Sequence, residues 1–289
     1  MVEESSRDSV GEKPLAGQVA IITGGGRGLG RAMALGLAKA GAAVVATAAR
    51  ERHELKGLAD EAATTDTTNI LYTLVADVTR EEDCARTVAL TLERFGRLDI
   101  LVNNAGRGMK YVSENFMTQP TRFWETPADT WRFVIETNVV GPFLMARAAV
   151  PTMLSAGWGR IINVSINADT MRRRGFSPYG PSKAALESAT TILAQDLADS
   201  GVTVNALLPG GPVLTGMIPS GFPDHLRASL LDPAIMVPPL LWITSTKSDG
   251  VTGRRFVATS WREDSPESTG WLVTLAAFPP SQTFRHQES

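Results

Sequence analysis

The chain has 289 residues, of which 43% are hydrophobic, and a formal net charge of −2. This length is sufficient for one large domain with a substantial core, and the near-neutral charge argues against nucleic acid or an anionic membrane as a partner. A single cysteine, Cys84, excludes an internal disulfide framework and favours a reducing compartment. We therefore expect a cytoplasmic protein, with Cys84 as a small core residue.

The first 16 residues are polar, contain several acidic side chains and have no apolar stretch of the kind found in secretory signals. We predict that residues 1–16 form a flexible arm. No run of about 18 uncharged apolar residues occurs, so no membrane span is expected. The three histidines are scattered without the spacing of metal ligands, so we expect no metal site.

The remainder of the chain alternates between predicted strands and helices, starting with a strand at 19–26, a helix at 29–41 and a strand at 42–48. The predicted strands have few polar positions, as strands of a parallel sheet covered on both faces do. We therefore predict a single α/β domain over residues 17–260, a Rossmann-type doubly wound parallel sheet with helices on both faces. Further strands are predicted at 70–78, 98–106, 159–165, 202–210 and 254–259, and further helices at 80–96, 127–154 and 182–201.

Two segments depart from this alternation: a connection at 107–124, rich in methionine and aromatic residues, and an extension at 261–289. Long connections at the carboxyl ends of strands often form binding sites. Each segment either covers a binding site or is an ordinary surface insertion. The connection at 107–124 is the stronger candidate for the binding site.

Glycines cluster between the first predicted strand and the first predicted helix, in TGGGRGLG at 23–30. Such a loop lets the backbone approach a pyrophosphate while the helix N-terminus supplies N–H donors. A glycine cluster alone also suits a tight turn, but its position favours a nucleotide site.

The sequence resembles the classical short-chain dehydrogenase/reductase family through three motifs that occur in the family's order over about residues 17–260. They are T-G-x-x-x-G-x-G at 23–30, NNAG at 103–106, and Tyr179-x-x-x-Lys183. The resemblance implies a nicotinamide cofactor, hydride transfer to or from a small-molecule carbonyl or alcohol, and a homodimer or homotetramer. It also implies cofactor contacts at Gly24, Gly26, Arg27, Gly28, Leu29, Gly30, Asp77, Val78, Asn104, Ala105, Gly106, Tyr179, Lys183, Pro209, Gly210, Val213 and Thr215. Thr215 follows the family's usual threonine position by one residue, so its contact requires a bulge in the loop.

The end of the second predicted strand bears on the choice between NAD(H) and NADP(H). An acidic residue is usual there in NAD sites, whereas this chain has Ala48 and Ala49. Arg27 and Arg50 are available to pair with a 2′-phosphate. We therefore favour NADP(H), with NAD(H) as the alternative.

Tyr179 and Lys183 are four residues apart at the start of a predicted helix, which places them on one face. A nearby ammonium lowers the pKa of a tyrosine and favours proton transfer. By resemblance, Tyr179 is the catalytic acid/base, Lys183 holds the cofactor ribose, and Asn138 anchors a water in the proton relay.

The family's catalytic serine aligns with Ile166, one residue after Ser165. A shift of one residue turns a strand side chain to the opposite face. Three alternatives are open: a local bulge returns Ser165 to the site, Asn167 donates the hydrogen bond to substrate, or the site lacks this donor. We favour Ser165 as the fourth catalytic residue, with Asn167 as its rival.

The three arginines at 172–174 lie between Ser165 and Tyr179. They could attract an anionic substrate, but a solvated loop or a subunit contact is the favoured interpretation. The aromatic and methionine side chains of the 107–124 connection are expected to line a partly apolar substrate pocket; these are Met109, Tyr111, Phe116, Met117 and Phe123.

The sequence thus predicts an oxidoreductase. An alternative from a different class is a catalytically impaired nucleotide-binding regulator or scaffold of the same fold, which the isoleucine at 166 would suit.

Overall fold

A computed structural model of the chain describes residues 13–50, 52–64, 70–219 and 221–266. Within these residues one seven-stranded sheet has the order β3-β2-β1-β4-β5-β6-β7, and neighbouring strands pair in parallel throughout. Every strand predicted from the sequence is present. Their bounds are β1 (Val19–Ile22), β2 (Ala43–Ala48), β3 (Leu71–Val75), β4 (Ile100–Asn103), β5 (Gly159–Val164), β6 (Val202–Leu208) and β7 (Arg255–Val257).

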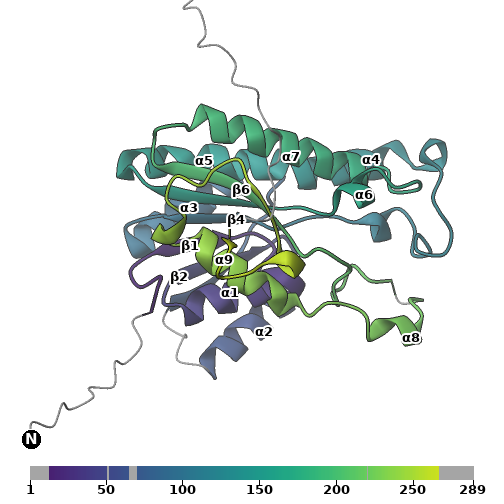
Figure 1. The fold of residues 1–289 in the computed structure, drawn as a ribbon, viewed down its shortest axis with the longest axis horizontal. Coiled ribbons are helices and arrows are strands. Elements are labelled where there is room, and N and C mark those ends of the chain that lie inside the picture. Colours follow the sequence, from purple (N-terminus) through teal and green to yellow (C-terminus); the bar gives the residue numbers. More distant parts are fainter. Residues whose placement is uncertain (1–12, 51, 65–69, 220, 267–289) are drawn as a thin grey trace, which may run out of the picture.

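Helices cover both faces of this sheet (Figure 1). On one face lie α3 (Glu81–Phe95), α5 (Gly141–Ala156) and α7 (Tyr179–Asp196), and on the other lie α1 (Gly28–Lys39), α2 (Arg52–Ala63) and α9 (Val237–Ile243). Each face has its own cluster of buried apolar side chains against the strands. The predicted doubly wound α/β fold is therefore confirmed. The strands are apolar because helices cover the sheet on both faces.

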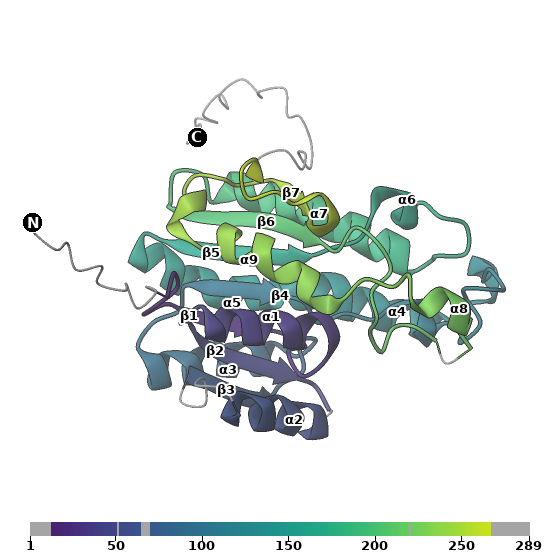
Figure 2. The same ribbon diagram turned by 60° about the horizontal axis from the view of Figure 1, so that its bottom comes forward.

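Three further helices, α4 (Ala128–Ile135), α6 (Ala168–Met171) and α8 (Asp224–Arg227), gather at one end of the molecule (Figures 1 and 2). The long helix predicted at 127–154 is present as α4 and α5, joined by a π-helical turn at Glu136–Val140. The sequence analysis missed the four-residue helices α6 and α8, and also α2 and α9. Only three of the twelve residues of α2 are buried, and α9 has only seven residues, with proline in its first turn.

The domain begins earlier than predicted. Leu15 is fully buried in the core, and its N–H donates to the carbonyl of Ala40 at 2.9 Å. Residues 13–16 therefore belong to the domain, whereas the analysis placed them in the arm; residues 1–12 lie outside the described part. At the other end, the Trp261 ring packs on Trp242 and Phe256, with centroids 5.6 and 6.4 Å away. Residues 267–289 of the extension lie outside the described part of the chain.

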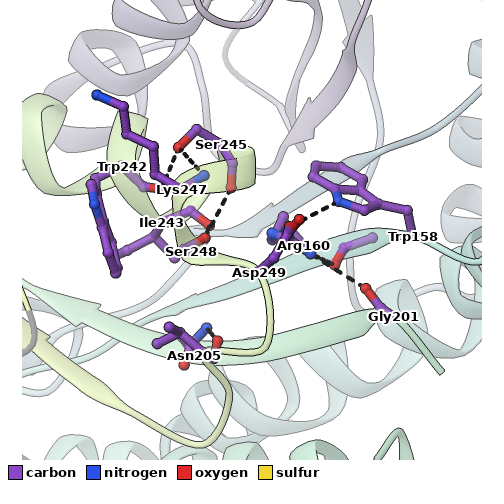
Figure 3. A network of polar contacts seen from close by, with 12 residues as sticks. Trp158, Arg160, Gly201, Asn205, Trp242, Ile243, Ser245, Lys247, Ser248 and Asp249 are labelled. Atoms are coloured by element: carbon purple, nitrogen blue, oxygen red, sulfur yellow. Dashed lines mark hydrogen bonds and ion pairs between the residues drawn. The ribbon is translucent and has the colours of Figure 1, made fainter. Parts of the chain in front are cut away.

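A buried arginine anchors the amino end of β5. Arg160 is 1% exposed, and its guanidinium donates to the carbonyls of Gly159 and Gly201 at 2.9 and 3.3 Å. Asp249 pairs with Arg160 and accepts a hydrogen bond from the Trp158 indole, so it lies between the two (Figure 3). Burial lowers the pKa of Arg160, while Asp249 opposes this shift. This pair fixes the end of β5 that lies away from residues 164–167.

One helical segment in the described part of the chain, 128–156, is long and apolar enough to cross a membrane by length and composition. Its most apolar window has a mean hydropathy of 1.4, and 33% of that window is buried. The segment is the α4–α5 helix, in which Met145, Ala149 and Met153 are buried against the sheet. Packing of α5 on the parallel sheet accounts for this buried part of its apolar character, whereas Phe143 and Leu154 are exposed.

Candidate functional site

The glycine loop between β1 and α1 is a cradle of bare backbone. A Cβ atom added to Gly30 would lie 2.1 Å from the carbonyl oxygen of Gly24, and one on Gly24 would lie 3.0 Å from Cα of Ala105. The side-chain amide of Asn104 donates to the carbonyls of Thr23 and Gly24 at 2.9 and 3.0 Å. Since no side chain fills this surface, a phosphate can approach the backbone closely.

A cavity of about 340 Å³ lies over this cradle. It brings together most of the predicted cofactor residues: Gly24, Gly26, Arg27, Gly28, Leu29, Gly30, Asp77, Val78, Asn104, Ala105, Gly106 and Thr215. The combination of a glycine cradle, a helix N-terminus and a polar opening fits a dinucleotide.

The other predicted cofactor residues do not line this cavity. Arg50 is exposed on the surface. The carbonyls of Pro209 and Gly210 accept hydrogen bonds from within the domain, and Val213 forms a bridge with Leu231. Tyr179 and Lys183 lie at the start of α7 and are described below.

Thr215 does reach the cofactor cavity. A Cβ atom added to Gly28 would lie 3.1 Å from Cγ2 of Thr215, so the two residues are in contact across the cavity opening. The loop after β6 therefore brings Thr215 to the glycine cradle in spite of its displaced position in the sequence.

Glu54, on α2, lines the cavity and was missed by the sequence analysis. Its carboxylate pairs with Arg27 at 2.9 Å, and its Cβ would be 3.0 Å from a Cβ added to Gly26. The sequence reasoning looked for an acid only at the end of β2, where Ala48 and Ala49 stand. The acid in this cavity comes instead from the following helix, α2.

Tyr179 and Lys183 lie on the first turns of α7. The ammonium of Lys183 is buried and donates to the carbonyl of Val164 at 2.8 Å. It would be 3.7 Å from a Cβ added to Gly106, so it borders the cofactor segment.

The pKa values of Tyr179 and Lys183 differ from the sequence expectation. Burial lowers the pKa of Lys183 to about 8, while the nearby carboxylate of Glu187 acts in the opposite direction. Burial raises the pKa of Tyr179 to about 12. The expected lowering of the Tyr179 pKa by Lys183 is not what this structure shows, since desolvation of the phenol dominates.

Asn138 lies in the π-helical turn between α4 and α5 and is fully buried. Its Nδ2 donates to the carbonyl of Arg107 and to the Ser182 hydroxyl, each at 2.9 Å, and its Oδ1 accepts from the Arg107 N–H at 2.7 Å. Both amide protons are thus engaged within the protein. A relay water would therefore have to donate a hydrogen bond to an oxygen atom of Asn138.

The hydroxyl of Ser165 donates to the carboxylate of Glu187 at 2.6 Å. Glu187 also accepts from Arg255 at 3.0 Å, and Arg255 donates to the carbonyl of Ile166 at 2.7 Å. Because Glu187 lies one helical turn beyond Lys183, Ser165 is directed along α7, away from Tyr179. The proton of Ser165 is therefore occupied, which does not support our preference for this serine as the substrate donor.

Asn167 occupies a different position. Its Nδ2 donates to the carbonyl of Gly210 at 2.9 Å. An amide nitrogen carries two protons, so this bond leaves one available. No described hydrogen bond uses the second proton. Asn167 therefore has a free N–H donor, whereas the hydroxyl proton of Ser165 is bonded to Glu187.

The aromatic residues of the 107–124 connection are divided between two places. Tyr111 lines the cofactor cavity, where the guanidinium of Arg107 stacks on Tyr111 and on Phe133, 4.7 and 4.9 Å from the ring centroids. Phe116 packs edge to face on Phe176. Phe123 borders a separate groove, Met109 is buried in the interior, and Met117 is partly buried.

Comparison with known proteins agrees with this geometry. The family model described as short chain dehydrogenase matches residues 18–224. The chain is 35% identical over 210 residues to the D-beta-hydroxybutyrate dehydrogenase of Rhizobium meliloti (strain 1021), a match covering 73% of this chain and 77% of that protein.

Solved structures superpose over most of the chain. A protein from Beutenbergia cavernae, described as an NAD(P)-dependent gluconate 5-dehydrogenase with NADP bound at low occupancy, has a TM-score of 0.73 and 31% identity over 86% of this chain and 97% of that chain. The 3-ketoacyl-(acyl-carrier-protein) reductase of Brucella melitensis, complexed with NADH, has a TM-score of 0.73 and 29% identity over 84% of this chain and 97% of that chain.

Proposed function

Because this chain belongs to the short-chain dehydrogenase family and is an NAD(P)-dependent oxidoreductase, we propose the following specific reaction. The enzyme transfers a hydride between NADP(H) and a small-molecule carbonyl or alcohol, with Tyr179 as the acid/base. The observation that carries the proposal is the Tyr179–Lys183 pair on α7, whose ammonium borders the cofactor segment at Gly106.

The nicotinamide, when bound, supplies or accepts the hydride. Tyr179 gives its phenolic proton to the oxygen that becomes the alcohol, or takes it in the reverse direction. We assign Lys183 to holding the ribose and stabilising a tyrosinate, because its ammonium borders Gly106. Asn167, rather than Ser165, supplies the donor to the substrate oxygen, since it retains an unused amide proton. A regulator without chemistry is the weaker alternative, because these catalytic groups are all present.

We also propose a preference for NADP(H) over NAD(H). Arg27 lines the cavity, and its guanidinium can pair with a 2′-phosphate. That guanidinium is paired with Glu54, so the phosphate has to compete with a carboxylate for Arg27. The preference is therefore expected to be moderate.

A fluorescence titration with NADPH and, in parallel, NADH tests this proposal. Wild-type protein should bind NADPH more tightly. The Glu54→Gln variant should increase the ratio of NADH to NADPH dissociation constants about tenfold, corresponding to ~1.4 kcal/mol, because it frees Arg27 and removes a negative charge.

The control is Glu61→Gln, which breaks the equivalent pair between α2 and α1, Arg31–Glu61, outside the cavity lining. It should leave the ratio unchanged. An equal shift in both variants would show that general surface charge, not Glu54, sets the preference. Failure to bind either nucleotide would contradict the proposed function itself.

The pH dependence of the reaction depends on Glu187. The Lys183 ammonium persists below its pKa of about 8 and is lost as the pH rises through that value. Glu187 favours the charged form, so Glu187→Gln should lower this pKa further. We expect the alkaline fall of kcat/KM to move to lower pH in the variant.

Asp249→Asn is the matched control, because it breaks an ion pair at the opposite end of β5 (Figure 3). It should lower the melting temperature without moving the pH profile. If Glu187→Gln also lowers only the melting temperature, Glu187 has a purely structural role.

We propose a cytoplasmic homodimer or homotetramer assembled through α5 and α7. Phe143 and Leu154 on α5 and Ile192 on α7 are exposed apolar side chains, the kind of surface that an interface covers. The single, buried thiol of Cys84, whose pKa is raised to about 12 by burial, suits a reducing compartment.

A further inference from the structure

A second cavity, of about 770 Å³, lies between residues 118–124 and 171–177 and extends to Pro181. We call it the arginine groove. Its walls include Ser177 and Pro181, which lie on either side of Tyr179 in the chain. The groove is therefore formed in part by the segment that carries Tyr179, although Tyr179 itself is not among its lining residues.

Four arginines line the groove, namely Arg122, Arg172, Arg173 and Arg174, and no carboxylate is among its lining residues. Arg122 pairs with Glu125 outside the lining, at 3.4 Å. The guanidinium groups of Arg172 and Arg174 have no ion-pair or hydrogen-bond partner among the described residues, and both side chains are exposed. This concentration of positive charge is unlike the cofactor cavity, where Glu54 neutralises Arg27.

The groove also has aromatic walls. Phe123 and Trp124 are 68% and 66% exposed and pack edge to face at 5.1 Å. Arg173 lies over the Phe176 ring, 5.1 Å from its centroid. Large exposed aromatics in a concave site indicate a binding surface, so the groove suits an apolar body that carries an anionic group.

The two walls are fixed to each other. The Thr121 hydroxyl donates to the carbonyl of Gly175 at 2.8 Å. Gly175 has φ +81°, and a Cβ added to it would lie 2.9 Å from Cβ of Pro120. Phe116 packs on Phe176, next to Gly175 in the chain, with centroids 5.9 Å apart. The groove is thus a built feature of two interlocked loops.

We propose that the arginine groove binds an anionic group of the substrate, carboxylate or phosphate, and so selects anionic carbonyl or alcohol compounds. This inference rests on the proposed function, since it assigns the substrate class of that reaction. Arginine is suited to the role because its planar fork matches both anions.

The kinetic test compares 4-carboxybenzaldehyde with its neutral methyl ester, methyl 4-formylbenzoate, at saturating NADPH. The double variant Arg172→Gln/Arg174→Gln should lower the ratio of kcat/KM for the acid to that for the ester by roughly 10- to 100-fold, the range expected for losing charge-assisted hydrogen bonds. The charge-matched control is Arg94→Gln/Arg147→Gln, on α3 and α5, and it should leave the ratio unchanged. Equal effects in the two double variants would overturn the proposal.

The second measurement needs no turnover. Terephthalate, which lacks a carbonyl that can be reduced, and phenyl phosphate are titrated by calorimetry into the wild-type protein, the groove variant Arg172→Gln/Arg174→Gln and its control Arg94→Gln/Arg147→Gln. Binding that weakens in the groove variant but not in its control supports the groove even if no substrate is turned over, and the tighter of the two probes identifies the favoured anion. Failure of both probes to bind wild-type protein would overturn the inference and leave the cofactor titration unaffected.

Discussion

Replacing Tyr179 by phenylalanine is expected to lower kcat by roughly 10³-fold, within the range contributed by a general acid or base. The substitution removes the phenolic proton and retains the aromatic ring, so the packing of this partly buried ring is kept. The dissociation constant for NADPH should change little, because the glycine cradle and the segment at 104–106 do not involve this hydroxyl. Steady-state kinetics together with the cofactor titration measure the two effects separately.

The control for this substitution is Tyr111→Phe. Tyr111 lines the cofactor cavity and its hydroxyl bonds to Arg107, yet it has no place in the proposed proton transfer. It should retain most of the activity. Full activity in Tyr179→Phe would refute the assigned mechanism, whereas tight NADPH binding without turnover by the wild-type protein would favour the regulator alternative.

Gly30→Ala is expected to weaken cofactor binding by at least roughly tenfold, or ~1.4 kcal/mol. The added methyl group would lie 2.1 Å from the carbonyl oxygen of Gly24 and 2.5 Å from Nδ2 of Asn104. Both neighbours are part of the cradle, so relieving the contact must move backbone and break the bonds that join the glycine loop to Asn104. Overpacking of this kind also costs about 1–3 kcal/mol of stability.

Gly36→Ala, six residues later on the same helix, separates the two effects. Its methyl group would lie 2.6 Å from Cγ1 of Val237, on the core side of α1 and away from the cavity. We expect a lower melting temperature with unchanged affinity for NADPH. Equal losses of affinity in the two variants would mean that α1 is displaced as a whole and that the cradle at Gly30 has no special role.

The sequence by itself determined the α/β fold and, through three motifs shared with a known family, the oxidoreductase class. Strands such as Ile100–Asn103 and Gly159–Val164 are buried along their whole length, and apolar runs separated by helices leave a parallel sheet with two covered faces as the solution. The glycine loop lies within one strand-to-helix junction, and Tyr179 and Lys183 lie about one helical turn apart on α7. The local sequence pattern is therefore sufficient to locate both motifs in the fold.

Tertiary structure decided which side chains meet across the chain. Glu54 reaches Arg27 from a helix that the sequence pattern did not reveal. Ser165 is drawn to Glu187, 22 residues away, and the groove forms because Thr121 is bonded to Gly175, 54 residues away. The direction of a side chain at the end of a strand changes with a single residue of register, and contacts between loops depend on packing that no local pattern encodes. The cofactor preference, the substrate donor and the substrate class are consequently questions for the three-dimensional structure.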